Sequence, residues 1–173
     1  MPYPFSRVFH QVVGRLAVLA LLLSLAACAS APLTYKIRPG ASTAELSFLT
    51  DREPRYGGAV IYQHGADCRE PLPTNVRERY VIHANEVATF MMGGEGDNAK
   101  GQRMECGLHV TFTPAPNAKY LASYEFNEDD CSIVLVKLSE APGGRPEPVD
   151  AVIREVRRPL FQSGSFCEPV GIE

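Results

Sequence analysis

Apolar and polar residues alternate with a period of two along several short stretches of the chain, and this pattern predicts β-strands. In the clearest case, the segment 44–50, the apolar side chains fall on every second position: Ala44, Leu46 and Phe48. Because successive side chains of a strand point to opposite faces, this segment is expected to be a half-buried strand. The more continuous apolar run 59–63 predicts a buried strand.

Two further strands are expected to form a hairpin around the connection 84–86, namely 79–83 and 87–92. The segment 69–75 holds two prolines and is predicted to be an irregular surface loop, because proline interrupts a strand ladder. A final strand is expected at 150–156. The irregular tail 159–173 after it is expected to be held by Cys167.

The segment 106–138 predicts a three-stranded antiparallel meander with one apolar face. A turn at 114–118 would pair the first two strands as follows: Phe112 with Tyr120, Val110 with Ala122, Leu108 with Tyr124 and Cys106 with Phe126. A turn at 127–130 would pair the second and third strands as follows: Cys131 with Phe126, Ile133 with Tyr124 and Leu135 with Ala122.

Composition agrees with a chain of short strands and many turns, since it includes fourteen prolines, fourteen glycines and no tryptophan. No internal repeat or long amphipathic helix is apparent. We therefore predict a single, mostly β domain over 34–173. About seven or eight strands, mainly antiparallel, are expected.

The first 27 residues have the pattern of a signal peptide. Arg7 and Arg15 give the leading region a positive charge, and no acidic residue precedes the apolar run 16–27. This run is shorter than the ~20 apolar residues that a membrane-spanning helix needs. A cleaved signal followed by a short tether, 28–33, is therefore expected.

The residues Leu25-Ala26-Ala27-Cys28 resemble the lipobox of bacterial lipoproteins. The resemblance implies that cleavage leaves Cys28 as the new N-terminus, that its thiol takes a diacylglyceryl group, and that its amine can be acylated too, so that palmitate would label it. It also favours the outer membrane, because Ala29 stands where an aspartate commonly marks inner-membrane retention. A soluble secreted protein with a chance cysteine here is the alternative.

The middle third of the chain carries a second resemblance. The segments YVIHANEVATF, KYLASYEF and CSIVLVKL, together with a cysteine-led strand that runs into FTP, resemble small proteobacterial lipoproteins of unknown function. The resemblance implies a β-sandwich fold and an envelope location, and it implies no particular activity.

Four cysteines remain once Cys28 is assigned to lipid: Cys68, Cys106, Cys131 and Cys167. An even number suits disulfides in an oxidising compartment, whereas spacings of 38, 25 and 36 residues do not suit a zinc site. In the meander, one strand would separate Cys106 from Cys131 by about 9–10 Å, which exceeds the reach of a disulfide. We therefore favour Cys68–Cys106 with Cys131–Cys167. The exchanged pairing stays open, and a bulge or slipped turn would permit Cys106–Cys131.

Net charge limits the classes of partner. Without Arg7 and Arg15, fifteen basic residues face twenty acidic ones, which gives the mature chain a formal charge of −5. This balance argues against a nucleic-acid-binding protein. The expected partners are the membrane, through the lipid on Cys28, and an envelope protein.

Motifs for cofactors and metals are weak, and none is expected to be bound. The glycine-rich segment 93–101 lacks the lysine and hydroxyl residues of a phosphate-binding loop, and the turn 127–130 lacks the alternating ligands of a calcium loop. Thioether and imidazole groups could hold copper, but without characteristic spacing: Met91, Met92 and Met104 with His64, His83 or His109.

Catalytic signals are weak as well. No serine lies in a GxSxG frame, the histidines are far apart in sequence, and acidic pairs such as Glu78 with Glu86 arise by chance in an acidic chain. We therefore expect a membrane-anchored, non-catalytic envelope lipoprotein with a structural or partner-binding role. The alternative is a periplasmic inhibitor or accessory protein of cell-wall hydrolases or proteases.

Overall fold

The computed structural model describes residues 34–50, 58–76, 78–97, 103–126, 130–155, 157, 160 and 164–168. The chain divides into two compact units, Met1–Pro32 and Leu33–Glu173, and all described residues belong to the second. The predicted signal peptide, the lipid-attachment residue Cys28 and the turn residues 127–129 therefore lie outside the described residues. Within the described part, no helix has the length and apolarity needed to cross a membrane.

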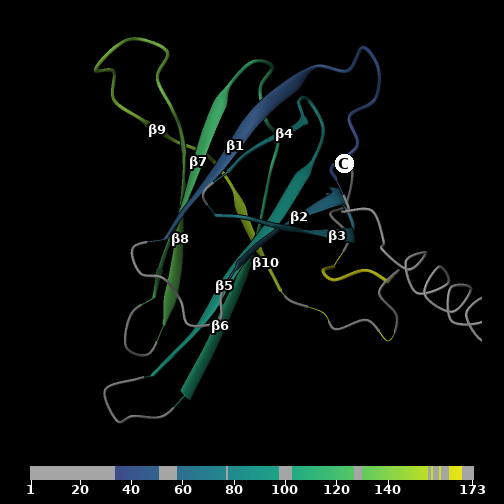
Figure 1. Ribbon diagram of the computed structural model, residues 1–173, viewed down its shortest axis with the longest axis vertical. Coiled ribbons are helices and arrows are strands. Elements are labelled where there is room, and N and C mark those ends of the chain that lie inside the picture. The colour runs from purple at the N-terminus through teal and green to yellow at the C-terminus, as the bar shows by residue number, and fades with distance from the viewer. Residues whose placement is uncertain are drawn as a thin grey trace, which may run out of the picture. The chain divides into compact units, whose positions relative to one another are not determined.

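In the part of the chain that the structure describes, ten strands form two five-stranded sheets, which confirms the predicted β-sandwich (Figure 1). Sheet A has the order β4-β1-β7-β8-β9, with these bounds: Arg79–His83, Thr43–Thr50, Lys119–Phe126, Cys131–Lys137 and Glu147–Pro148. Sheet B has the order β10-β6-β5-β2-β3, with these bounds: Val152–Arg154, Arg103–Phe112, Ala88–Asp97, Gly58–His64 and Arg69–Thr74.

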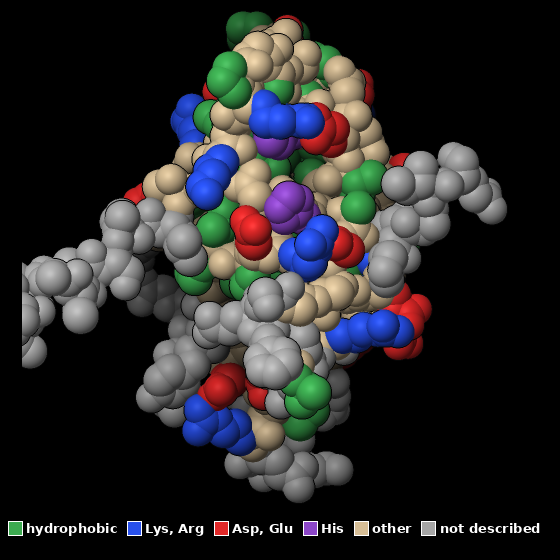
Figure 2. Space-filling view, turned by 90° about the vertical axis from the view of Figure 1, so that its right-hand side faces the viewer, with side chains coloured by type: hydrophobic (Ala, Val, Ile, Leu, Met, Phe, Trp, Pro, Cys, Tyr) green, Lys and Arg blue, Asp and Glu red, His purple; other side chains and the backbone are tan. Residues whose placement is uncertain are grey.

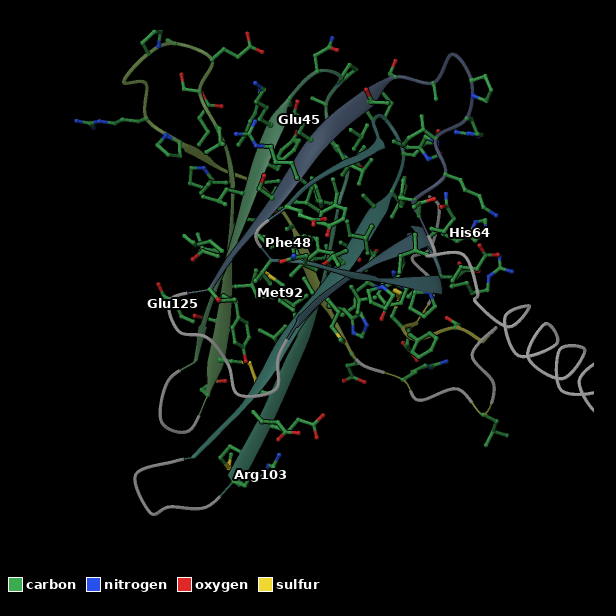
Figure 3. All side chains as sticks on the ribbon, viewed as in Figure 1. Glu45, Phe48, His64, Met92, Arg103 and Glu125 are labelled. Atoms are coloured by element: carbon green, nitrogen blue, oxygen red, sulfur yellow. A yellow bond between two sulfur atoms is a disulfide. The ribbon has the colours of Figure 1, made fainter. Side chains whose placement is uncertain are left out.

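The core lies between the sheets and follows the period-two pattern of the sequence. The predicted set Ala44, Leu46 and Phe48 is buried, and across the gap β5 contributes Phe90 and Met92. Phe48 and Phe90 pack edge to face with ring centroids 5.5 Å apart. In Figure 3 the labelled Phe48 and Met92 lie between the two layers. Burying such side chains supplies most of the driving force for folding.

The predicted meander is half right. Strands β7 and β8 pair in the predicted register, with Phe126 opposite Cys131 and Ala122 opposite Leu135. The pairing of β6 with β7 is wrong, because β6 belongs to sheet B and pairs with β5, while β7 pairs in parallel with β1. Phe112 and Tyr120 still meet, but as a T-shaped ring pair across the sandwich, 5.0 Å between centroids.

The predicted hairpin around 84–86 is wrong for the same reason, since β4 joins sheet A and β5 joins sheet B. Two of the connections that cross between the sheets, β4–β5 and β6–β7, each contain an asparagine with a φ of +60°, Asn85 and Asn117. Asparagine tolerates this left-handed conformation better than most residues. The two crossings support each other, because the Asn85 N–H donates to the Pro114 carbonyl at 2.8 Å.

The segment 69–75, predicted as a loop, instead contains the edge strand β3, which pairs with β2. Prolines in a strand are tolerated at a sheet edge, where the ladder continues on one side alone. The expected strand at 150–156 is real but shorter, because β10 covers Val152–Arg154. The glycine-rich segment is partly strand as well, since Gly93 and Gly94 pair with β6.

The four predicted cysteines form two disulfides, Cys68–Cys167 and Cys106–Cys131. The favoured pairing was therefore wrong. With β6 and β8 in different sheets, Cys106 and Cys131 face each other across the sandwich at a Cα separation of 6.1 Å, rather than lying in one sheet with a strand between them. Cys106–Cys131 links the two sheets, and Cys68–Cys167 attaches the C-terminal segment to the turn after β2.

Candidate functional site

The outer face of sheet B, which points away from the core, is covered by the C-terminal segment 164–168. Cys68 and Cys167 are both fully buried and join this segment to the turn that follows β2. The Phe166 ring packs on Tyr62 with centroids 5.9 Å apart, and the Phe166 N–H donates to the Cys68 carbonyl at 3.2 Å. We call this covered area the roofed face.

Gly65 shapes the roofed face because its backbone comes very close to β5. A Cβ atom on Gly65 would lie 2.2 Å from the Val87 carbonyl oxygen, so no other residue fits without a shift. The Gly65 carbonyl accepts hydrogen bonds from the Thr89 hydroxyl at 2.6 Å and from Arg154 Nη1 at 3.2 Å. Thr89 in turn contacts the hydroxyl of Thr111 at 2.7 Å. This carbonyl therefore connects three elements of the roofed face.

The most buried polar contact of the roofed face joins Tyr62 and His109. The Tyr62 hydroxyl lies 2.7 Å from His109 Nε2, and the His109 side chain is fully buried. Arg154 lies directly opposite His109 in the register of β10 and β6. Since neighbouring strands carry opposed residues on the same face, these side chains form one cluster, which we call the Tyr62–His109–Arg154 cluster.

Burial keeps the tyrosine and histidine of this cluster neutral. It raises the pKa of Tyr62 to about 12, and burial together with the Arg154 charge lowers the pKa of His109 to about 4. Since the tyrosine hydroxyl needs an acceptor, the consistent assignment has it donating to an unprotonated Nε2. Neither group can then exchange a proton readily near pH 7, as a general acid or base must.

Two buried polar atoms of the cluster have no hydrogen-bond partner among the described residues, His109 Nδ1 and Arg154 Nη2. A buried polar atom without a hydrogen-bond partner costs stability. The closed roof and the neutral Tyr62–His109 pair nevertheless suit a structural or positioning role better than catalysis.

Most of the candidate copper ligands lie apart, although Met91 and His109 lie opposite each other on β5 and β6. His83 belongs to sheet A and contacts Tyr35, whereas His64 and His109 lie on sheet B and contact Glu70 and Tyr62. Among the methionines, Met92 is buried between the sheets while Met91 packs beside the roofed face. The structure therefore gives no support to a shared copper site for these side chains.

One other group of potential metal ligands occurs among the described residues, formed by Cys106, Asp130 and Cys131. Both sulfur atoms belong to a disulfide, so neither can supply a thiolate. The acidic pair suggested by the sequence is also separated, because Glu78 accepts from the Tyr80 hydroxyl while Glu86 pairs with Arg38.

The outer face of sheet A differs, because aliphatic side chains remain in contact with solvent. Leu49, Val81 and Val134 are 51%, 49% and 51% exposed. Leu121 and Val136 lie opposite each other on the same face and are half-buried. Charged residues share this face: Glu45 lies opposite both Val81 and Lys119, and Glu125 lies near the end of β7; both glutamates are labelled in Figure 3. We call this area the open face. Exposed apolar patches with a polar border are typical of contact surfaces.

Sequence reasoning missed the Tyr62–His109–Arg154 cluster. The polar character of His109 and Thr111 gave no sign in the sequence that this side of β6 is covered. The available signal was the fourth cysteine, since a Cys68–Cys167 link would have laid the tail over the end of β2 and the strands beside it.

In comparisons with known proteins, no family model, curated protein or solved structure matches the chain.

Proposed function

We propose that this protein is a lipid-anchored lipoprotein of the bacterial cell envelope, attached through Cys28 to the outer membrane. The observation that carries the proposal is the signal-peptide pattern that ends in Leu25-Ala26-Ala27-Cys28. The two disulfides support it independently, because they suit an oxidising compartment such as the one that this signal would reach.

In this proposal the folded domain is non-catalytic and binds an envelope protein. The neutral, roofed Tyr62–His109 pair supports the non-catalytic part, since a substrate would need the roof to open before it could reach either group. The open face supports the binding part. A partner that covers Leu49 and Val134 would remove apolar surface from water at about 25 cal/mol per Å².

The test is metabolic labelling with palmitate followed by membrane fractionation. The natural chain should incorporate the label and sediment with outer membranes, whereas Cys28→Ser should lose the label and be released or misprocessed. Cys167→Ser is the matched control, because it removes another cysteine and should leave the label in place. Unchanged labelling of Cys28→Ser would refute the lipid anchor.

A further inference from the structure

The chain segment before the first strand is fixed to the domain. The Lys36 N–H donates to Gln63 Oε1 at 2.7 Å, and Gln63 Nε2 donates to the Lys36 carbonyl at 3.0 Å. The Arg38 N–H donates to Nε2 of the buried His83 at 3.1 Å, and the half-buried Tyr35 ring packs against the same histidine. These contacts hold the segment 35–38 against the domain, one residue after Thr34, the first residue that the structure describes.

The remaining tether is short compared with the domain. Between the lipidated residue of the proposed function, Cys28, and Thr34 there are six residue steps, which span about 21 Å when fully extended. The ten-residue strand β5 alone is about 30 Å long. A tether shorter than the domain cannot let every face of the domain approach the bilayer equally. The face that carries Thr34 must stay near the membrane.

The charges of this face are balanced although the mature chain is acidic. Three ion pairs surround the fixed segment: Arg38 with Glu86, Arg69 with Asp67, and His64 with Glu70. Among the described residues, these pairs and Lys36 give the face three permanent cations and three anions. Figure 2 shows this side of the molecule, where blue and red side chains stand next to one another around histidines.

We propose that this face, which we call the anchor face, rests against the zwitterionic headgroups of the membrane that holds Cys28. The inference depends on the proposed lipid anchor. A phosphate and an ammonium group within one headgroup match a surface of paired cations and anions, and zero net charge avoids repulsion by the membrane. The open face on sheet A then remains available for a protein partner.

Two arginines with similar exposure make this testable. Arg38 on the anchor face pairs with Glu86, and Arg103 pairs with Glu95; their side chains are 64% and 66% exposed. Arg103 lies opposite Asp97, the last residue of β5. Gly65 lies near the other end of β5, where its carbonyl accepts a hydrogen bond from Thr89. That separation is about 27 Å along the strand. The rates at which an arginine-specific dicarbonyl reagent modifies the two residues in solution give a reference ratio, and at a membrane the Arg38 rate should fall relative to the Arg103 rate.

The experiment uses the lipidated protein in vesicles of phosphatidylethanolamine and phosphatidylcholine, with modification rates read by mass spectrometry. We expect the Arg38 to Arg103 rate ratio to be about tenfold lower than in a variant with about twelve Gly-Ser residues inserted between Leu33 and Thr34, which adds roughly 20 Å of mean reach. The same insertion between Gly143 and Gly144, in an exposed loop, should leave the low ratio unchanged.

The outcomes separate the two proposals. If the natural chain does not float with the vesicles, the proposed lipid anchor is wrong, and the proposed anchor face, which depends on it, is wrong too. If it floats but the rate ratio equals that of the tether-insertion variant, the anchor face is wrong while the lipid anchor stands. Protection of Arg103 instead of Arg38 would place the opposite end of the domain at the membrane and would also overturn the inference.

Discussion

The roofed face of sheet B and the open face of sheet A are built from similar alternating strands, yet their outward side chains differ in exposure. On the roofed face, polar groups such as His109 and Thr89 are buried and bonded under the C-terminal segment. On the open face, aliphatic groups such as Leu49 and Val134 remain exposed. Whether an outward-facing side chain is polar or apolar therefore did not predict whether it is exposed to solvent.

The roofed face contributes to the stability of the domain, whereas the open face contributes little to stability and is available for contact with a partner. Buried polar groups contribute to a defined structure only while their partners and cover stay in place. Exposed aliphatic groups contribute little to folding, so they can be changed at small cost. The following predictions test this contrast, from the largest expected effect to the smallest.

Removing the roof should have the largest effect. The double variant Cys68→Ser, Cys167→Ser should lower the free energy of unfolding by about 4–5 kcal/mol, because a disulfide across 99 residues restricts the unfolded chain strongly. The control is Cys106→Ser, Cys131→Ser, whose 25-residue separation predicts a smaller loss of about 3.5 kcal/mol. Urea denaturation measures both, and a larger loss in the control would contradict this ranking.

The second effect is a pH dependence of stability from the roofed face. The pKa of His109 is about 4 in the folded protein and about 6.5 when unfolded, so between these values the unfolded chain binds the extra proton. Stability from this group is present above pH 6.5 and is lost as the pH falls through 4, on the order of 3 kcal/mol.

The control for this pH dependence is His109→Gln, which can still bond to the Tyr62 hydroxyl but does not titrate. Denaturation midpoints measured from pH 7 to pH 4 should fall less steeply in this variant. A residual slope is expected from His83, whose pKa burial and the Arg38 charge also lower. Identical slopes for the variant and the natural chain would show that His109 is not buried when folded.

The smallest effects are expected when threonine is replaced by valine on the roofed face and valine by threonine on the open face. Thr89→Val on the roofed face removes the hydroxyl bonded to Gly65 and Thr111, and should cost about 1–2 kcal/mol. Val134→Thr on the open face should change stability by less than about 0.5 kcal/mol. Thermal denaturation of both variants checks this, and equal losses would mean that the open face is covered in the folded protein.

Sequence reasoning captured what depends on local alternation. The buried set of β1 and the register of β7 with β8 follow from side-chain parity and a short turn, and both were correct. The connections 84–86 and 114–118 were wrong, because a short connection can join strands within one sheet or cross to the other. Both arrangements bury the same parity, so Phe112 and Tyr120 are inward in either case.

The disulfide error followed from the misplaced strand. Once β6 was assigned to the sheet of β7, Cys106 and Cys131 seemed too far apart to bond, although they face each other between the sheets. Arg154 was also unpredictable, because nothing in a short apolar segment indicates that its arginine will be buried against the carbonyl of Gly65. Such contacts depend on tertiary placement, which alternation does not encode.

The central claim is that the mature protein begins at a lipidated Cys28, and the most direct measurement is the mass of its N-terminal peptide after purification from membranes. We predict a peptide that starts at Cys28 and carries a diacylglyceryl thioether, with or without an acyl group on the amine. A peptide that starts elsewhere, or an unmodified Cys28 in the membrane fraction, would contradict the account.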